Sequence, residues 1–218
     1  MKPLNIAALT AASLFVLSAC SGEQEPGDQS ADAATEDVTF ADVSDDRLND
    51  AAATPAEWLG YGFDREETRH SPLTGITADN IGELGVAWTY DLATSRGVES
   101  TPIVIDGVMY VTSAWSIVYA LDAKTGEELW VYDPDVDRAV GVNACCDVVN
   151  RGVALYEGKL FLGVIDGRVE ALDAKTGERI WSKVTVDQSK PYTITGAPRT
   201  PSSAPPFPIR TLPSTTRG

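Results

Sequence analysis

The sequence ALDAKTGEELW at residues 120–130 recurs, with two substitutions before the final Trp, as ALDAKTGERIW at residues 171–181. The segments before the two copies also correspond, with GVMYV at 107–111 and GKLFL at 158–162. In each copy a short apolar run leads into an Asp-x-x-Thr-Gly turn and then into a second run that ends in Trp. A repeat of about four short strands with a terminal Trp is typical of a β-propeller blade.

Short apolar runs separated by Gly, Asp and Asn predict the strands. We expect them at residues 86–90, 102–105, 108–112, 117–121 and 128–132. Asp106-Gly107 is a hairpin turn signal, and we expect the terminal Trp residues to pack between neighbouring blades while the Asp and Thr of each turn satisfy backbone groups.

Only two full blades are recognisable, at residues 86–133 and 151–183. Propellers typically close with four to eight blades, so two cannot complete a ring. The sequence therefore predicts an all-β partial propeller of two to three blades within residues 51–199, as a fragment of a longer protein.

The C-terminal stretch 200–218 differs in character, with five Pro, many Ser and Thr, two Arg and no acidic residue. It also breaks the blade pattern in mid-course. We interpret it as an aberrant tail, for example from a frameshift; a genuine Pro-rich tail is the alternative.

The N-terminus, residues 1–19, reads as an export signal, with Lys2 followed by a short apolar run that is too short for a permanent membrane span. It ends in Leu-Ser-Ala-Cys, which resembles a bacterial lipoprotein cleavage box and implies lipidation of Cys20. The alternative is an ordinary secretory peptide with Cys20 incidental. We expect a periplasmic protein held to a membrane by this lipid, and Ser21 favours the outer membrane over the inner one.

Residues 20–50 are polar and acidic, with ten Asp or Glu against the single Arg47. Such a segment buries too little apolar surface to offset its ordering entropy, which predicts a flexible tether. The whole chain carries a formal net charge of −15. This charge argues against nucleic-acid binding, which needs clustered Lys and Arg.

Two adjacent cysteines, Cys145 and Cys146, precede Arg151 by a few residues. Adjacent Cα atoms lie about 3.8 Å apart, below the roughly 4.4–6.8 Å usual for a disulfide, so such a pair can close only as a small strained ring. Export would place it in an oxidising compartment, where a disulfide persists. A flat ring beside a planar guanidinium suggests a planar, acidic ligand. The alternative is two ordinary thiols beside a surface Arg.

Together these features resemble the quinoprotein alcohol dehydrogenases, which are periplasmic eight-bladed propellers built around pyrroloquinoline quinone (PQQ) and Ca²⁺. The resemblance covers residues 58–199. It is carried by Trp58 to Trp88, Glu99-Ser-Thr-Pro, the Trp-ended repeats, the cysteine pair and Arg151-Gly-Val-Ala.

The resemblance implies that Cys145 and Cys146 form a vicinal disulfide that stacks on one face of PQQ. It also implies that Arg151 pairs with a PQQ carboxylate, that Glu99 hydrogen-bonds the cofactor's polar edge, and that Thr195 contacts the cofactor from the next blade. From spacing alone, Glu99 would be a solvated loop acid and Thr195 a turn hydroxyl.

The family's Ca²⁺ ligands and catalytic Asp base lie in later blades, so the resemblance implies that this chain alone is inactive. The complete enzyme would oxidise an alcohol to an aldehyde by hydride transfer to the quinone and pass electrons to cytochrome c or a similar acceptor. The haem motif Cys-x-x-Cys-His of some members is lacking. The lone histidine, His70, reads as a loop residue.

A non-catalytic propeller lipoprotein that serves as a scaffold in outer-membrane protein assembly is the alternative function. Such scaffolds share the lipobox, the polar tether and the Trp-ended repeats. The cysteine pair with Arg151 favours the enzyme family, because a scaffold does not need it.

Overall fold

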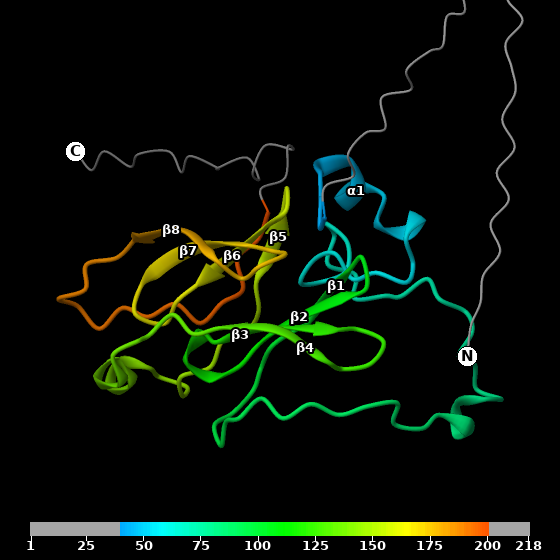
Figure 1. The fold of residues 1–218 in the computed structure, drawn as a ribbon, viewed down its shortest axis with the longest axis horizontal. Coiled ribbons are helices and arrows are strands. Elements are labelled where there is room, and N and C mark those ends of the chain that lie inside the picture. Colours follow the sequence, from blue (N-terminus) through cyan, green and yellow to red (C-terminus); the bar gives the residue numbers. More distant parts are fainter. Residues whose placement is uncertain (1–39, 201–218) are drawn as a thin grey trace, which may run out of the picture. The chain divides into compact units, whose positions relative to one another are not determined.

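The computed structural model describes residues 40–200, which form two four-stranded antiparallel sheets of consecutive strands (Figure 1). The first sheet has the order β1-β2-β3-β4 and the second the order β5-β6-β7-β8. The strands are β1 Ile103–Ile105, β2 Val108–Thr112, β3 Val118–Asp122, β4 Glu128–Tyr132, β5 Ala154–Tyr156, β6 Lys159–Gly163, β7 Arg168–Asp173 and β8 Arg179–Val184. Each sheet contains one copy of the repeat, which confirms the prediction of propeller blades.

The turn inside each repeat is stabilised by its Asp. Asp122 Oδ1 accepts hydrogen bonds from the backbone N–H of Thr125 at 2.7 Å and from its hydroxyl at 2.9 Å. Asp173 and Thr176 repeat these contacts at 2.8 and 3.2 Å. The Asp and Thr of the repeat therefore satisfy turn backbone groups, as expected.

A Trp ring packs against the glycine that ends each turn. A Cβ added to Gly126 would lie 2.5 Å from Cε3 of Trp88, and one added to Gly177 would lie 2.6 Å from Cε3 of Trp130. Both glycines have positive φ angles, +75° and +73°. Because Trp130 belongs to β4 and Gly177 follows β7, this contact joins the two sheets, which confirms that a Trp packs between the blades.

A buried carboxylate makes a second link between the sheets. Glu170 of β7 is fully buried, and it accepts a hydrogen bond from the hydroxyl of Tyr132 of β4 at 2.6 Å. Arg168 pairs with the same carboxylate at 2.7 Å, and Ser182 donates to it at 2.8 Å. A buried charge is tolerated when it is paired and hydrogen-bonded in this way. Burial, and then Glu170, raise the pKa of Tyr132 to about 12.

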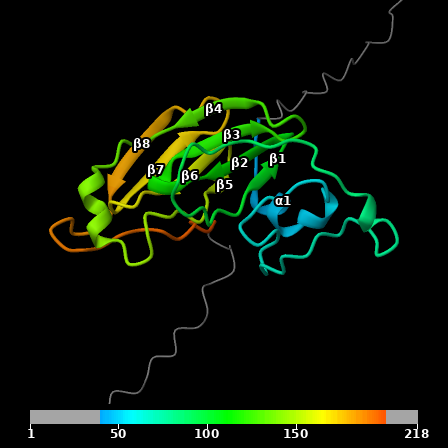
Figure 2. The ribbon, with the colours of Figure 1, turned by 90° about the horizontal axis from the view of Figure 1, so that it is seen from below.

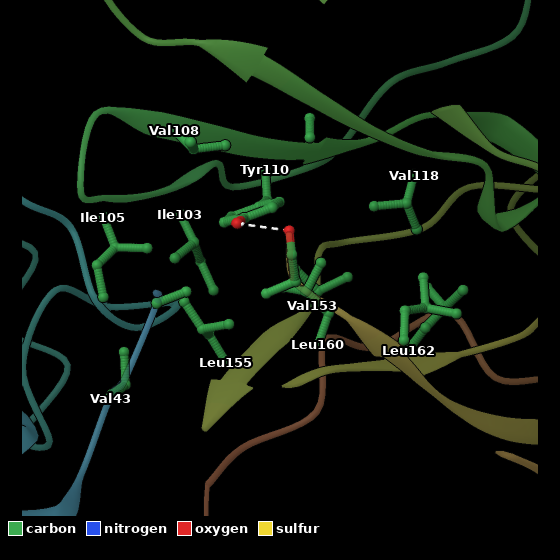
Figure 3. Close-up of a cluster of buried hydrophobic side chains, with 14 of the residues drawn as sticks. Val43, Ile103, Ile105, Val108, Tyr110, Val118, Val153, Leu155, Leu160 and Leu162 are labelled. Atoms are coloured by element: carbon green, nitrogen blue, oxygen red, sulfur yellow. Dashed lines mark hydrogen bonds between the residues drawn. The ribbon is translucent and has the colours of Figure 1, made fainter. Parts of the chain in front are cut away.

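The core lies between the two sheets, which overlap in Figure 2. Alternate residues of the inner strands point into it, as the two-residue period of a strand requires. The hydroxyl of Tyr110 donates a hydrogen bond to the carbonyl of Ala174 at 2.9 Å, so its polar end is satisfied inside the core. Figure 3 shows this cluster, which includes Val43, Ile103, Ile105, Val108, Tyr110, Val118, Val153, Leu155, Leu160 and Leu162.

The prediction of a flexible tether at residues 20–50 is wrong for residues 40–50, which pack against the folded part of the chain. Ala41, Val43 and Leu48 are buried in the core. The carbonyls of Val43 and Ala41 accept hydrogen bonds from the backbone of residues 157 and 158, and Arg47 pairs with Glu57 at 2.8 Å. A short helix, α1 Asp45–Asn49, is capped by Ser44 within this stretch. The packed part of the chain therefore includes residue 40, and the rest of the predicted tether lies outside the described residues.

The strand expected at residues 86–90 is absent from the described structure, because none of the eight strands pairs with this segment. A strand needs a neighbouring ladder for its backbone groups. Trp88 still docks on Gly126, so its packing role is kept without the strand. The remaining short elements are 3₁₀ helices, η1 Ala51–Ala53, η2 Ile81–Glu83, η3 Ala114–Ser116 and η4 Arg138–Asn143.

Candidate cofactor site

The candidate site is built on the segment that connects β4 to β5 and carries the cysteine pair. Asn150 anchors this segment with its side chain, which is almost fully buried. Its amide nitrogen donates to the carbonyl of Gly163 at 2.8 Å and its oxygen accepts from the N–H of Gly152 at 2.9 Å. Gly152 has a φ of +129°, and a Cβ there would meet the carbonyl of Thr101 at 3.0 Å. These contacts fix the backbone on both sides of Arg151.

Arg151 connects two other proposed site residues, Glu99 and Thr195, which are far apart in the sequence. Its Nη2 lies 2.6 Å from Oε2 of Glu99, and its Nη1 donates to the hydroxyl of Thr195 at 2.8 Å. The backbone repeats the connection, since the N–H of Arg151 donates to the carbonyl of Thr195 at 3.1 Å. Glu99, Arg151 and Thr195 come from segments before β1, before β5 and after β8. They form one hydrogen-bonded cluster.

The cysteine pair lies beside this cluster. Cys145 and Cys146 are both exposed and both free thiols in the structure, with their Sγ atoms 2.8 Å apart. The predicted disulfide therefore stays a prediction. The hydrogen bond and charge interaction with Cys145 raise the pKa of Cys146. The charge of Arg151 opposes this rise, and that of Glu99 adds to it.

The residues present fit one side of a planar, acidic cofactor. A guanidinium has five N–H donors, and the side chain of Arg151 remains 34% exposed after its contacts with Glu99 and Thr195. It therefore keeps donors for a carboxylate. The exposed thiols beside it offer a weakly polar surface against which a ring could lie. All five proposed cofactor-binding residues, Glu99, Cys145, Cys146, Arg151 and Thr195, are thus gathered in one region.

Several residues that support the site have no recognisable signal in the sequence. Asn150 is one of them, and a lone Asn in a loop gives no signal of a buried anchor. Ser100 is another, because its hydroxyl accepts a hydrogen bond from the N–H of Thr112 at 3.0 Å and thereby ties the Glu99 segment to β2. A third is the ion pair of Arg96 with Asp147 at 2.7 Å.

The other proposed positions take no part in this site. His70 lies in an exposed loop, as expected. Across residues 40–200, no group of three or more His, Cys, Asp or Glu side chains is placed to hold a metal ion. Within the same residues, no helix is long and apolar enough to cross a membrane. Cys20 and the signal peptide lie outside the described residues, as does the tail from residue 201.

Comparison with known proteins identifies the family of the chain. The family model for the glucose/ethanol/alcohol dehydrogenase PQQ β-propeller domain matches residues 58–191. The chain is 62% identical over 148 residues to a 1-butanol dehydrogenase (cytochrome c) of Thauera butanivorans, covering 67% of this chain and 21% of that protein.

Solved structures give the same result. A quinohemoprotein alcohol dehydrogenase, ADHIIG of Pseudomonas putida, is 52% identical with a TM-score of 0.72, and the match covers 74% of this chain and 24% of that one. A europium-containing methanol dehydrogenase is 40% identical with a TM-score of 0.66, over 70% of this chain and 27% of that one. The chain thus spans about a fifth to a quarter of the length of these relatives. It belongs to the PQQ-dependent alcohol dehydrogenase β-propeller family.

Proposed function

We propose that this chain provides one wall of the PQQ site of an alcohol-oxidising quinoprotein. The observation that carries the proposal is the cluster of Glu99, Arg151 and Thr195 beside the exposed pair Cys145 and Cys146. The relatives named above are alcohol dehydrogenases, and over the matched residues the chain is 62% and 52% identical to two of them.

In this site Arg151 would hold a carboxylate of the cofactor, because a planar guanidinium matches a carboxylate in two parallel hydrogen bonds. Thr195 would fix the direction of the guanidinium through its hydroxyl and would contact the cofactor. Glu99 would orient Arg151 from the other side and accept from the cofactor's polar edge. Cys145 and Cys146, closed as a vicinal disulfide, would cover one face of the ring system and exclude water from it.

When bound, the quinone supplies the hydride-accepting centre for the oxidation of an alcohol to an aldehyde. A divalent or trivalent metal would act beside it as a Lewis acid, and we propose Ca²⁺. One relative is a europium-containing enzyme, so metal replacement is part of the test below. Because the chain spans only 21% of the length of the 1-butanol dehydrogenase, we propose that this chain alone does not oxidise alcohols.

We also propose a cytochrome c or a similar protein as electron acceptor, since one relative is named for that acceptor. The proposed location is the periplasm, on a membrane, preferably the outer one, through a lipid on Cys20. The Leu-Ser-Ala-Cys sequence at residues 17–20 supports this proposal. Labelling cells with a radioactive fatty acid should mark the wild-type chain but not Cys20→Ser; labelling of both would refute the anchor.

The cofactor wall is tested by PQQ binding to the purified chain in equilibrium dialysis. Arg151→Lys keeps the charge but loses the planar fork, and we expect it to weaken binding about tenfold or more, since charge-assisted hydrogen bonds contribute about 1.5–3 kcal/mol. Arg138→Lys is the control, because Arg138 is half exposed and pairs only loosely with Asp133, at 3.7 Å. Equal affinity of Arg151→Lys and wild type would refute the role of Arg151.

The enzymatic part of the proposal is tested on the chain extended by the blades of a close relative. With PQQ and Ca²⁺, and separately with a lanthanide ion, this protein should reduce an artificial acceptor in the presence of primary alcohols. The absence of acceptor reduction across a panel of alcohols with every metal would refute the proposed reaction.

A further inference from the structure

The turn that carries the cysteine pair is held by the residue that follows it, Asp147. Asp147 has a φ of +70°, in the left-handed region that few non-glycine residues adopt. Its Oδ1 accepts a hydrogen bond from the N–H of Val148 at 2.8 Å, and residues 145 and 147 form an isolated parallel bridge. The direction in which the two thiols face therefore depends on the conformation of Asp147.

Arg96 holds this carboxylate from another segment. Its Nη1 donates to the same Oδ1 atom of Asp147 at 2.7 Å, and its guanidinium lies 5.9 Å from the ring centre of Trp115. Trp115 contacts the turn itself, because its backbone N–H donates to the carbonyl of Val148 at 2.8 Å. The residues after the cysteine pair are thus fixed by Arg96 through the side chain and by Trp115 through the backbone.

Two ion pairs join the same two segments, and in the second segment both of them follow the cysteines. Arg96 of the first segment pairs with Asp147 of the second, and three residues later Glu99 of the first pairs with Arg151 of the second. The order of charges is reversed between the two pairs, so a shift of one segment along the other would bring like charges closer. This arrangement sets the cysteine turn at a defined place relative to Glu99 and Arg151.

We propose that Arg96 is a positioning residue for the cysteine face of the site, acting through Asp147. This inference rests on the proposed function, because the placement of the thiols matters to a cofactor only if they cover one of its faces. Arg96 itself touches Asp147 and not the thiols. We expect Arg96 to affect the equilibrium between the two thiols and their disulfide, and that equilibrium can be measured without any cofactor.

The test measures the equilibrium between the dithiol and the vicinal disulfide in glutathione buffers, in the full chain carrying Cys20→Ser so that only the pair reacts. The two thiols lose two electrons and two protons as one S–S bond forms, and one glutathione disulfide becomes two glutathione thiols. Trapping with an alkylating reagent followed by mass spectrometry gives the fraction in each form, and circular dichroism checks that each variant folds.

We expect Arg96→Gln to lower the equilibrium constant for ring closure by up to about fivefold, the range of an exposed ion pair. Asp147→Asn keeps the acceptor oxygen for Val148 and should lower the constant equally, and the double variant should lower it no further. Arg96→Lys should remain within about twofold of wild type. The control is Arg138→Gln, because Arg138 lies over the same Trp115 ring at 4.4 Å but pairs with Asp133; it should change nothing.

An unchanged constant in Arg96→Gln, or an equal change in Arg138→Gln, would overturn the proposal. Its failure is distinguishable from failure of the proposed function. A chain that shows the expected shifts and binds no PQQ keeps the positioning role and refutes the cofactor site. A chain that binds PQQ while Arg96→Gln leaves the ring-closure constant unchanged keeps the cofactor site and refutes the positioning role.

Discussion

Replacing Gly177 by Ala tests the packing between the sheets, because it adds both a backbone strain and a steric clash with Trp130. Gly177 has a φ of +73°, and an added Cβ would lie 2.6 and 2.7 Å from two carbons of the Trp130 ring. The left-handed backbone costs an Ala about 1–2 kcal/mol. Forcing the ring away adds about 1–3 kcal/mol, the usual range for overpacking. Gly177→Ala should therefore lower the free energy of unfolding by about 2–5 kcal/mol.

Gly107→Ala is the matched control. Gly107 has a φ of +78°, but a Cβ there would have no atom within 4 Å. This variant should show only the backbone cost of about 1–2 kcal/mol. Urea unfolding followed by far-ultraviolet circular dichroism measures both variants without relying on Trp fluorescence. In a Trp130→Ala background the steric part of the Gly177→Ala cost should disappear.

Equal destabilisation by Gly177→Ala and Gly107→Ala would refute the reasoning. So would a Gly177→Ala cost that persists unchanged after Trp130→Ala, because the Trp130 ring is the group with which the added Cβ collides. Either result would mean that the ring does not rest on the glycine.

Three further predictions concern the core, the site anchor and pH. Leu160→Ala, at a fully buried position of β6, should lower the free energy of unfolding by about 2–5 kcal/mol, measured by urea unfolding; a change below 1 kcal/mol would contradict its place in the core. Asn150→Ala leaves the carbonyl of Gly163 and the N–H of Gly152 without partners, and should cost about 1–3 kcal/mol per unpaired buried group; retained stability in the same assay would contradict the anchor. A hydrogen bond to Glu128, followed by burial, raises the pKa of Tyr90 to about 12. Its contribution to stability should be fully present below pH 10 and lost as the pH rises toward 12, and Tyr90→Phe should remove that part of the pH dependence.

The repeat allowed the regular part of the fold to be predicted from sequence. The bounds expected for β2 and β4 agree with the structure, because each run begins just after a turn whose chemistry is local. The hairpin turn at Asp106 and Gly107, both with positive φ, follows from the Asp-Gly pair itself. These features depend on neighbours in the sequence, and a single sequence contains that information.

The failures concern contacts between distant segments. Residues 40–50 were predicted as tether because they are acidic, yet Ala41 and Val43 are buried through backbone bonds to the β5–β6 turn. The charge of Arg47 is balanced by Glu57 and Asp106 at 2.8 and 3.1 Å. Composition records neither of these partners. Likewise, a short apolar run such as residues 86–90 forms a strand only if a neighbouring strand is present to pair with it.

The residues proposed to contact the cofactor could be predicted from the sequence, but the residues that hold them in place could not. Cys145, Cys146 and Arg151 were found because adjacent cysteines followed by an Arg form an unusual pattern. Glu99 and Thr195 came only from the family resemblance, since neither residue is distinctive alone. Asn150 and the Arg96–Asp147 pair were missed, because their roles arise from packing between segments that lie far apart in the sequence.

The packing between the sheets and the geometry of the site are connected. Glu99 precedes the first sheet, whereas Arg151 and Thr195 flank the second, so the 2.6 Å contact of Glu99 with Arg151 depends on how the two sheets are placed. That placement is fixed in part by Trp130 on Gly177 and by Tyr132 on Glu170. Gly177→Ala should therefore weaken PQQ binding as well as stability.

Gly107→Ala lies in a hairpin within one sheet and should leave PQQ binding unchanged, even where it lowers stability. Dialysis at a urea concentration where both variants are folded separates the two effects. If Gly177→Ala bound PQQ as tightly as Gly107→Ala does, the site would be held by local contacts such as those of Asn150, and not by the packing between the sheets. A weaker affinity only in Gly177→Ala would mean that the contact between the blades sets the distance between Glu99 and Arg151, and so makes the docked Trp part of what shapes the cofactor wall.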